Sequence, residues 1–181
     1  MNRTQRTSPD LHSLADLFYG APDDLGKFEE VDATSVPAVY RQLLVHDAHM
    51  TVTVEKHHGC PVDVEVLSTK VTDSHYSRKI LLTRQSDGQV VQYGIVRLNL
   101  DYLGDEVRRE IEEQGTPLGH ILIQHNVLRD VKLLSLWKIT PGDDLRKCFG
   151  LQSPEICYGR TALIYCNGVI AVELLEVVTP E

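Results

Sequence analysis

Three charged side chains lie inside stretches of sequence that are otherwise apolar. Arg78 stands just before an Ile-Leu-Leu run, Arg160 opens the segment 161–165, and Glu176 lies within the nearly continuous apolar run 169–178. A charge in a buried strand is costly unless it is paired or faces a polar cavity. Two interpretations follow. One is an edge strand or a structural arginine–glutamate ion pair. The other is a buried anion site, in which arginines bind a carboxylate and Glu176 contacts a hydroxyl group.

Histidines form a second group with chemical potential. His46 and His49 flank Asp47, and the pair His57-His58 follows closely. Imidazole and carboxylate groups are ligands for transition metals. The chain has no HExxH or comparable spacing, and side chains at the expected junction between a helix and a strand need not converge. The sequence therefore favours solvent-exposed loop histidines over a metal site.

Motifs for covalent or phosphate chemistry are absent from the sequence. It contains no GxSxG elbow, no P-loop and no GxGxxG fingerprint. Cysteine–histidine catalysis could use any of four thiols and eight histidines, and nothing selects one pair. We therefore expect neither a metal nor a cofactor.

Charge and cysteine usage limit the partners and the compartment. The chain carries 18 Lys and Arg against 26 Asp and Glu, a formal net charge of −8, and so lacks the basic surface that phosphate backbones require. We therefore expect no nucleic-acid partner. No apolar stretch approaches the roughly 18 residues of a membrane span, and the first twenty residues do not form a signal peptide. The four cysteines form no CxxC pair, so we expect reduced thiols in a cytoplasmic protein.

Hydrophobic periodicity predicts the elements that position these residues. Helical spacing indicates helices over 11–19, from Ser35 to His46, over 101–114 and from Thr116 onward. The segment 21–33, rich in Pro, Gly, Asp and Glu, is typical of a loop. Alternating or β-branched residues predict strands at 51–54, 62–66, 76–84, 90–98, 131–137, 161–165 and 169–178.

Two turn signals arrange these strands as hairpins. Asp87-Gly88 separates the third and fourth predicted strands, and Asn167-Gly168 separates the last two. Regular alternation of strands and helices is missing, which disfavours a parallel doubly wound sheet. We predict an α+β fold with a mostly antiparallel sheet flanked by helices. Its 181 residues divide into a tail, short helix and loop at 1–34 and a single domain at 35–181.

Four segments carry a family resemblance, in order along the chain. They are Leu-Val-His-Asp-Ala-His-Met-Thr at 44–51, Ser-Arg-Lys-Ile-Leu-Leu at 77–82, Gly-Thr-Pro-Leu-Gly at 115–119 and the final hairpin at 158–180. Together they resemble the chorismate pyruvate-lyase family and the wider chorismate lyase-like superfamily, over residues 35–180. The resemblance implies a chorismate lyase-like fold for the single domain.

The resemblance also implies a function and a set of residues. Such an enzyme converts chorismate to 4-hydroxybenzoate and pyruvate without a cofactor, as in ubiquinone or phenolic biosynthesis. Met50 would line the pocket, Arg78 would bind the ring carboxylate, and Leu118 would supply a backbone contact. Arg160 is the candidate for the second carboxylate, and Glu176 would contact the ring hydroxyl or donate a proton.

Three questions stay open at this point. Glu173 lies three residues before Glu176, and alternation along a strand allows only one of them to face inward. A domain of this fold could instead bind a small aromatic acid without catalysis, as the effector-binding modules of transcription regulators do. A lyase acting on a related enolpyruvyl substrate is the third hypothesis.

Overall fold

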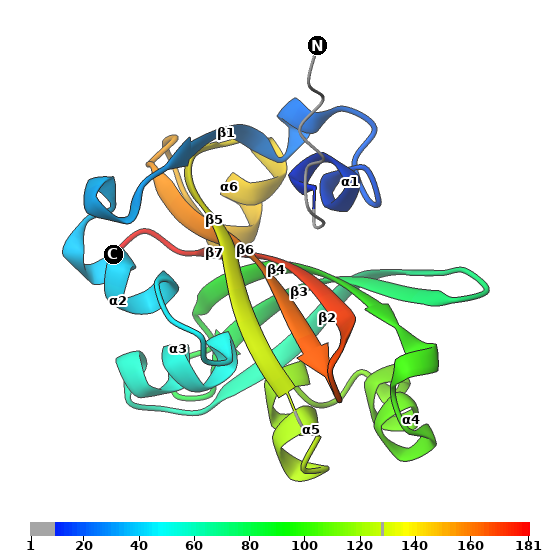
Figure 1. Ribbon diagram of the computed structural model, residues 1–181. Helices are drawn as coiled ribbons and strands as arrows, with labels where there is room; N and C mark the ends of the chain where they lie inside the picture. Colours follow the sequence, from blue (N-terminus) through cyan, green and yellow to red (C-terminus); the bar gives the residue numbers. More distant parts are fainter. Residues whose placement is uncertain (1–9, 128) are drawn as a thin grey trace.

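The structure is a computed structural model that describes residues 10–127 and 129–181, and within them seven strands form one antiparallel sheet (Figure 1). The strand order is β1-β5-β6-β7-β4-β3-β2. The strands are β1 Gly26–Val31, β2 Val62–Val71, β3 His75–Arg84, β4 Val90–Asn99, β5 Arg129–Pro141, β6 Cys157–Cys166 and β7 Val169–Val178. The helices are α1 Leu11–Ala15, α2 Ala38–Leu44, α3 Met50–His58, α4 Asp105–Glu113, α5 Leu118–Gln124 and α6 Asp143–Phe149, with short 3₁₀ turns at Pro22–Asp24, Ala33–Ser35 and Leu100–Tyr102.

The two predicted hairpins are confirmed and lie in the middle of the sheet. β3 and β4 are joined through the turn before Gly88, and β6 and β7 through Asn167-Gly168. Both residues of the second turn have positive φ, 52° and 84°, which a two-residue hairpin turn requires and which Asn and Gly adopt readily. The hairpins pair through β4 and β7, so the charged residues of β3, β6 and β7 share one sheet.

Two predicted segments differ from the structure. The β-branched residues 51–54 belong to the helix α3 and not to a strand, because its first residues pack inward with Met50 and Val54 fully buried. Burial of a helical face here outweighs the strand propensity of Thr and Val. The predicted loop 21–33 contains β1, an edge strand paired with β5. Most of its side chains are exposed, so no alternation marks it in the sequence.

The remaining elements agree in type and differ in extent. The helix predicted over 11–19 ends at Ala15, and α2 occupies the inner part of the segment predicted as helical from Ser35 to His46. The strand β5 extends beyond its predicted range at both ends, and α6 follows it as an unpredicted helix. All four cysteines are free thiols, as expected. Among the described residues, no helix is long and apolar enough to cross a membrane.

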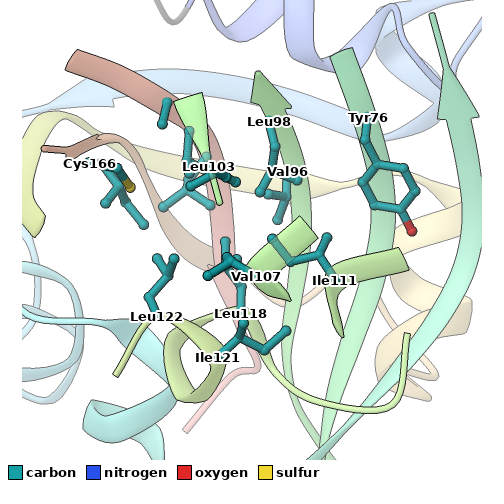
Figure 2. Packing of buried hydrophobic residues seen from close by; sticks show 14 of the residues in the cluster. Tyr76, Val96, Leu98, Leu103, Val107, Ile111, Leu118, Ile121, Leu122 and Cys166 are labelled. Atoms are coloured by element: carbon teal, nitrogen blue, oxygen red, sulfur yellow. The ribbon is translucent and has the colours of Figure 1, made fainter. Parts of the chain in front are cut away.

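Helices cover both faces of the sheet. In Figure 1, α1 and α6 lie above the sheet and α3, α4 and α5 below it. The upper layer encloses one hydrophobic cluster, and the lower layer encloses two, one under α2 and α3 and one under α4 and α5. Figure 2 shows the cluster under α4 and α5, with labelled side chains Tyr76, Val96, Leu98, Leu103, Val107, Ile111, Leu118, Ile121, Leu122 and Cys166. The candidate site lies between the two lower clusters.

Candidate functional site

A cavity lies between the sheet and the first turns of α3 and α5. The enclosed space measures about 40 Å³, well below the roughly 300 to 1,000 Å³ of small-molecule sites, so a ligand can enter only if the lining side chains move. Its floor comes from residues of six strands, β2 to β7, and its roof from the two helix starts. The lining residues are His49, Met50, Thr51, Val64, Arg78, Ile80, Leu82, Gln92, Gly94, Val96, Pro117, Leu118, Gly119, Val131, Arg160, Ile164, Leu174 and Glu176.

The structure brings all five of the predicted site residues to this one cavity. They are Met50, Arg78, Leu118, Arg160 and Glu176. Arg160 and Glu176 stand directly opposite each other on β6 and β7, and Gly94 on β4 is the next partner of Glu176. Arg78 lies two residues along β3 from the partner of Gly94, so its side chain extends from the same face.

The two glutamates of β7 are separated by the strand's alternation. Glu176 lines the cavity, while Glu173 forms an ion pair with Arg97. The residues stand three apart, which places them on opposite faces. Glu176 is therefore the cavity glutamate.

Arg160 is held entirely by protein groups. Its side chain is 0% exposed, and its Nε donates to Glu176 Oε2 at 2.7 Å. Its terminal nitrogens donate to three backbone carbonyls, that of Leu44 at the end of α2 (3.3 Å) and those of His46 (2.9 Å) and Ala48 (3.1 Å) in the segment that follows. The ion-pair interpretation therefore holds for Arg160 and Glu176. The guanidinium is engaged in fixing this segment over the sheet, which leaves little of it for the second carboxylate expected from the sequence.

Arg78 is equally buried and much less engaged. It is 1% exposed, yet neither its Nε nor its Nη1 has a hydrogen-bond partner among the described residues. Burial lowers the pKa of Arg78, an effect that its interaction with Tyr76 partly offsets. A guanidinium stays charged in proteins, so its free donors require an acceptor from elsewhere. An anion in the cavity would supply one.

The first turns of α3 and α5 meet at the roof of the cavity. Neither helix has a side-chain cap, so the amides of Met50, Thr51, Leu118 and Gly119 have no partner within their own helices. Gly119 permits this close approach, because a β-carbon there would lie 3.0 Å from Thr51 Oγ1. Free amides at a helix start attract negative charge. The roof therefore adds to the positive potential set by Arg78.

Gln92 and His49 are polar lining residues that were not selected from the sequence. Gln92 is a polar residue in the apolar strand β4, the same signal that identified the charged residues. His49 was expected to be solvent-exposed, but it is buried, and its Nε2 accepts a hydrogen bond from Arg129 Nε at 2.7 Å. Burial, followed by the nearby Arg129 and Arg160, lowers the pKa of His49 to about 4. His49 also lines a second, open groove together with Arg129, so it separates the cavity from that groove.

The histidines do not gather as the sequence suggested for a metal site. Among the described residues, the one group of three side chains close enough to share a metal ion is His57, His58 and Glu181. The Nε2 atoms of His57 and His58 lie 3.4 Å and 3.8 Å from the Glu181 carboxylate. None of the three lines the cavity.

Known proteins similar to this chain are found by comparing structures and not by comparing sequences. No family model matches the chain, and no curated protein matches it. The effector domain of PhnF from Mycobacterium smegmatis has a TM-score of 0.52 at 12% identity, covering 73% of this chain and 88% of that one. The ligand-binding domain of a protein described as a GntR-family transcriptional regulator, from Bordetella bronchiseptica, has a TM-score of 0.50 at 8% identity, covering 66% and 86%.

These similarities establish the fold. A longer structure of PhnF from Mycobacterium smegmatis has a TM-score of 0.51 at 12% identity. The match covers 73% of this chain and 64% of the PhnF chain, so this chain spans about two thirds of the length of that protein. The chain thus shares the fold of these effector and ligand-binding domains, and its seven-stranded antiparallel sheet confirms the predicted α+β class. The narrower resemblance to chorismate pyruvate-lyases stays a prediction.

Proposed function

We propose that the protein binds a small aromatic carboxylate in the cavity, with Arg78 as its anchor. The observation that carries this proposal is the buried guanidinium whose Nε and Nη1 have no partner among the described residues. Buried polar groups in native proteins are almost always hydrogen-bonded, and an unsatisfied one calls for an explanation. A bound carboxylate supplies that explanation through charge-assisted hydrogen bonds.

The rest of the cavity fits the body of such a ligand. Its walls are largely aliphatic, with Ile80, Leu82, Val96 and Leu174 facing the space. An apolar cavity with few polar groups is the usual form of a small-molecule site. The neighbouring structures include an effector domain and a ligand-binding domain of regulators, which supports a binding role for this one.

Chorismate pyruvate-lyase activity is a second candidate function. The observation that favours it is the convergence of Met50, Arg78, Leu118 and Glu176, the four positions matched by the family resemblance, on one cavity. In this reaction the ether bond to the enolpyruvyl group breaks, the ring loses a proton as it becomes aromatic, and the enolpyruvyl carbon gains one to give pyruvate. The cavity's contribution would be positioning of the substrate in a site with little water.

Two ligands of equal shape test the binding proposal. Calorimetric titration compares 4-hydroxybenzoate with 4-hydroxybenzamide, which keeps the ring and the hydroxyl and lacks the negative charge. We expect the carboxylate to bind at least about tenfold more tightly, since hydrogen bonds to charged groups contribute roughly 1.5 to 3 kcal/mol. Equal dissociation constants, or binding of neither compound, would rule out the anion site.

Turnover decides between the two candidate functions. Purified protein is incubated with chorismate, and 4-hydroxybenzoate and pyruvate are quantified against a reaction without protein. Equimolar products that decrease in Glu176→Gln support the lyase; this variant retains an acceptor for Arg160. Binding of 4-hydroxybenzoate without turnover of chorismate leaves the binding function and removes the chorismate lyase.

A further inference from the structure

Two histidines and a glutamate converge on one point at the end of α3, away from the cavity. His57 and His58 are the last two residues of α3, and Gly59 ends the helix in the left-handed conformation. The Nε2 of His57 lies 3.4 Å from Glu181 Oε2, and the Nε2 of His58 lies 3.8 Å from Glu181 Oε1. One nitrogen or oxygen atom from each of the three side chains lies within 4.8 Å of the other two. Two imidazoles and a carboxylate therefore face a common space.

The separations between these atoms are closer to those of metal ligands than to those of hydrogen-bonded partners. A hydrogen bond from N–H to oxygen measures about 2.7 to 3.2 Å, and both histidine–glutamate distances exceed it. Zinc bonds of about 2.0 to 2.2 Å in a tetrahedron place neighbouring ligand atoms roughly 3.3 to 3.6 Å apart. His57 and Glu181 already have this separation, and a small rotation of the side chain brings His58 to it.

The surroundings of the three side chains favour a bound cation. Histidine has an ordinary pKa of about 6.5, so imidazoles above neutral pH offer a lone pair to a metal. The C-terminal end of a helix adds partial negative charge from its unpaired carbonyls. Arg84 acts electrostatically on His58, but its Nε donates to Asp87 Oδ1 at 3.0 Å. The charge of Arg84 is therefore largely neutralised.

The three side chains are anchored by the protein and still reachable from solvent. The side chains of His57, His58 and Glu181 are 26%, 11% and 27% exposed. The backbone N–H of Glu181 donates to the Tyr40 hydroxyl at 2.8 Å, which fixes the segment after β7 beside α2 (Figure 1). The ring of Tyr40 packs in turn against Tyr158 of β6, with 4.6 Å between ring centroids. The group is thus assembled before any ion binds.

We infer that His57, His58 and Glu181 form a binding site for a divalent transition-metal ion of the zinc class. Imidazole suits zinc, copper, iron and nickel, whereas magnesium and calcium take oxygen ligands. Three protein ligands leave the fourth position of a tetrahedral zinc ion to water. The ion would join the end of α3 to the segment after β7 and so stabilise the folded chain. The sequence gave no sign of this site, because Glu181 lies far from the histidines along the chain.

Zinc titration of the full chain, freed of metal with a chelator, tests this inference. Calorimetry with zinc chloride should show one site per chain in the wild type. His57→Gln, His58→Gln and Glu181→Gln should each weaken it by about tenfold or more, since even the loss of an outer-shell partner costs 10- to 100-fold. His125→Gln is the matched control and should bind zinc as the wild type does. His125 is also 25% exposed and contacts the Glu110 carboxylate at 2.7 Å, but it belongs to no such group of three among the described residues.

A thermal scan tests whether the ion joins the two segments. At a free zinc concentration of ten times the dissociation constant, the Tm of the wild type should rise by about 3 °C or more. The three site variants should show no rise under the same conditions. Cys60→Ser is a second control, because this free thiol lies two residues after His58 and is itself a zinc ligand by type. It should retain both the affinity and the thermal shift, and excess magnesium should not displace the zinc.

The outcomes decide the inference independently of the cavity, which none of the three residues lines. No zinc binding by the wild type, or binding undiminished in the folded site variants, overturns the site. A loss in Cys60→Ser as large as that in the site variants places the ion at the thiol and also overturns it. Zinc binding without a rise in Tm overturns the joining of α3 to the segment after β7. If circular dichroism shows that no site variant folds, displacement of zinc by magnesium in the wild type rejects the inference.

Discussion

Two arginines lie on the same face of one sheet, are buried to the same degree, and have opposite surroundings. Arg160 donates to Glu176 and to three backbone carbonyls, and it fixes the segment between α2 and α3. Arg78, two strands away from Glu176 across β4, has two nitrogens that find no acceptor among residues 10–127 and 129–181. A satisfied buried charge is part of the architecture, whereas an unsatisfied one destabilises the ligand-free protein and becomes useful only when an anion arrives.

The largest loss of stability should come from substituting Arg160, the arginine whose hydrogen bonds are satisfied. Replacing Arg160 with Met leaves the Glu176 carboxylate and three carbonyls buried without their donor. We expect the free energy of unfolding to fall by about 3 to 5 kcal/mol, as measured by urea titration. A loss below about 1 kcal/mol would contradict the structural role assigned to Arg160.

The burial of His49, followed by its proximity to Arg129 and Arg160, gives a pH dependence of stability. His49 faces Arg129 and Arg160, and its pKa in the folded protein is about 4, below the 6.5 expected when unfolded. The unfolded chain therefore binds more protons between these values. His49 contributes its full stability above pH 6.5, and this is lost as the pH falls toward 4, by at most about 3 kcal/mol.

His49→Gln isolates this contribution. The side-chain amide retains an acceptor for Arg129 and does not titrate in this range. The difference in unfolding free energy between wild type and variant should shrink as the pH falls from 7 to 4, because only the wild type loses stability through His49. A difference independent of pH would contradict the buried, neutral state of His49.

The smallest effect should follow from a third arginine, which serves as a control for the other two. Arg97 is part-buried and pairs with Glu173 on the face opposite the cavity. Glu173 is buried but the Arg97 side chain is about one quarter exposed, so Arg97→Met should lower the unfolding free energy by less than Arg160→Met does. It should leave ligand affinity unchanged in calorimetry, and an affinity loss comparable to that of an Arg78 variant would place the anion site elsewhere.

The contrast between Arg78 and Arg160 also marks what the sequence could reveal. A charge within an apolar strand is costly, so Arg78, Arg160 and Glu176 could be selected from the sequence pattern alone. Strand alternation also predicts that Glu173 and Glu176 lie on opposite faces of the sheet. Nothing in the pattern separates the two arginines, because the acceptors of Arg160 other than Glu176 are backbone carbonyls of residues 44–48. Backbone acceptors carry no residue-type signal, and their position depends on how α3 packs.

Local propensity explains the main errors in the predicted fold. The central hairpins were predictable because Asp-Gly and Asn-Gly turns and apolar alternation agree there. The β-branched start of α3 favoured a strand, and only tertiary packing of Met50 and Val54 makes it a helix. His49, the residue before this helix, became buried for the same reason.

The most direct test of the account is a comparison of wild type and Arg78→Met, each measured with and without 4-hydroxybenzoate. Met is close in shape to the arginine stem and removes the two unsatisfied donors. Without ligand, we expect the variant to be at least as stable as the wild type, because an orphaned buried charge is gone. With ligand, it should show no thermal shift and an affinity lower by about tenfold or more. An Arg78→Met protein that loses stability and still binds 4-hydroxybenzoate like the wild type would contradict the central claim that Arg78 is the anion anchor.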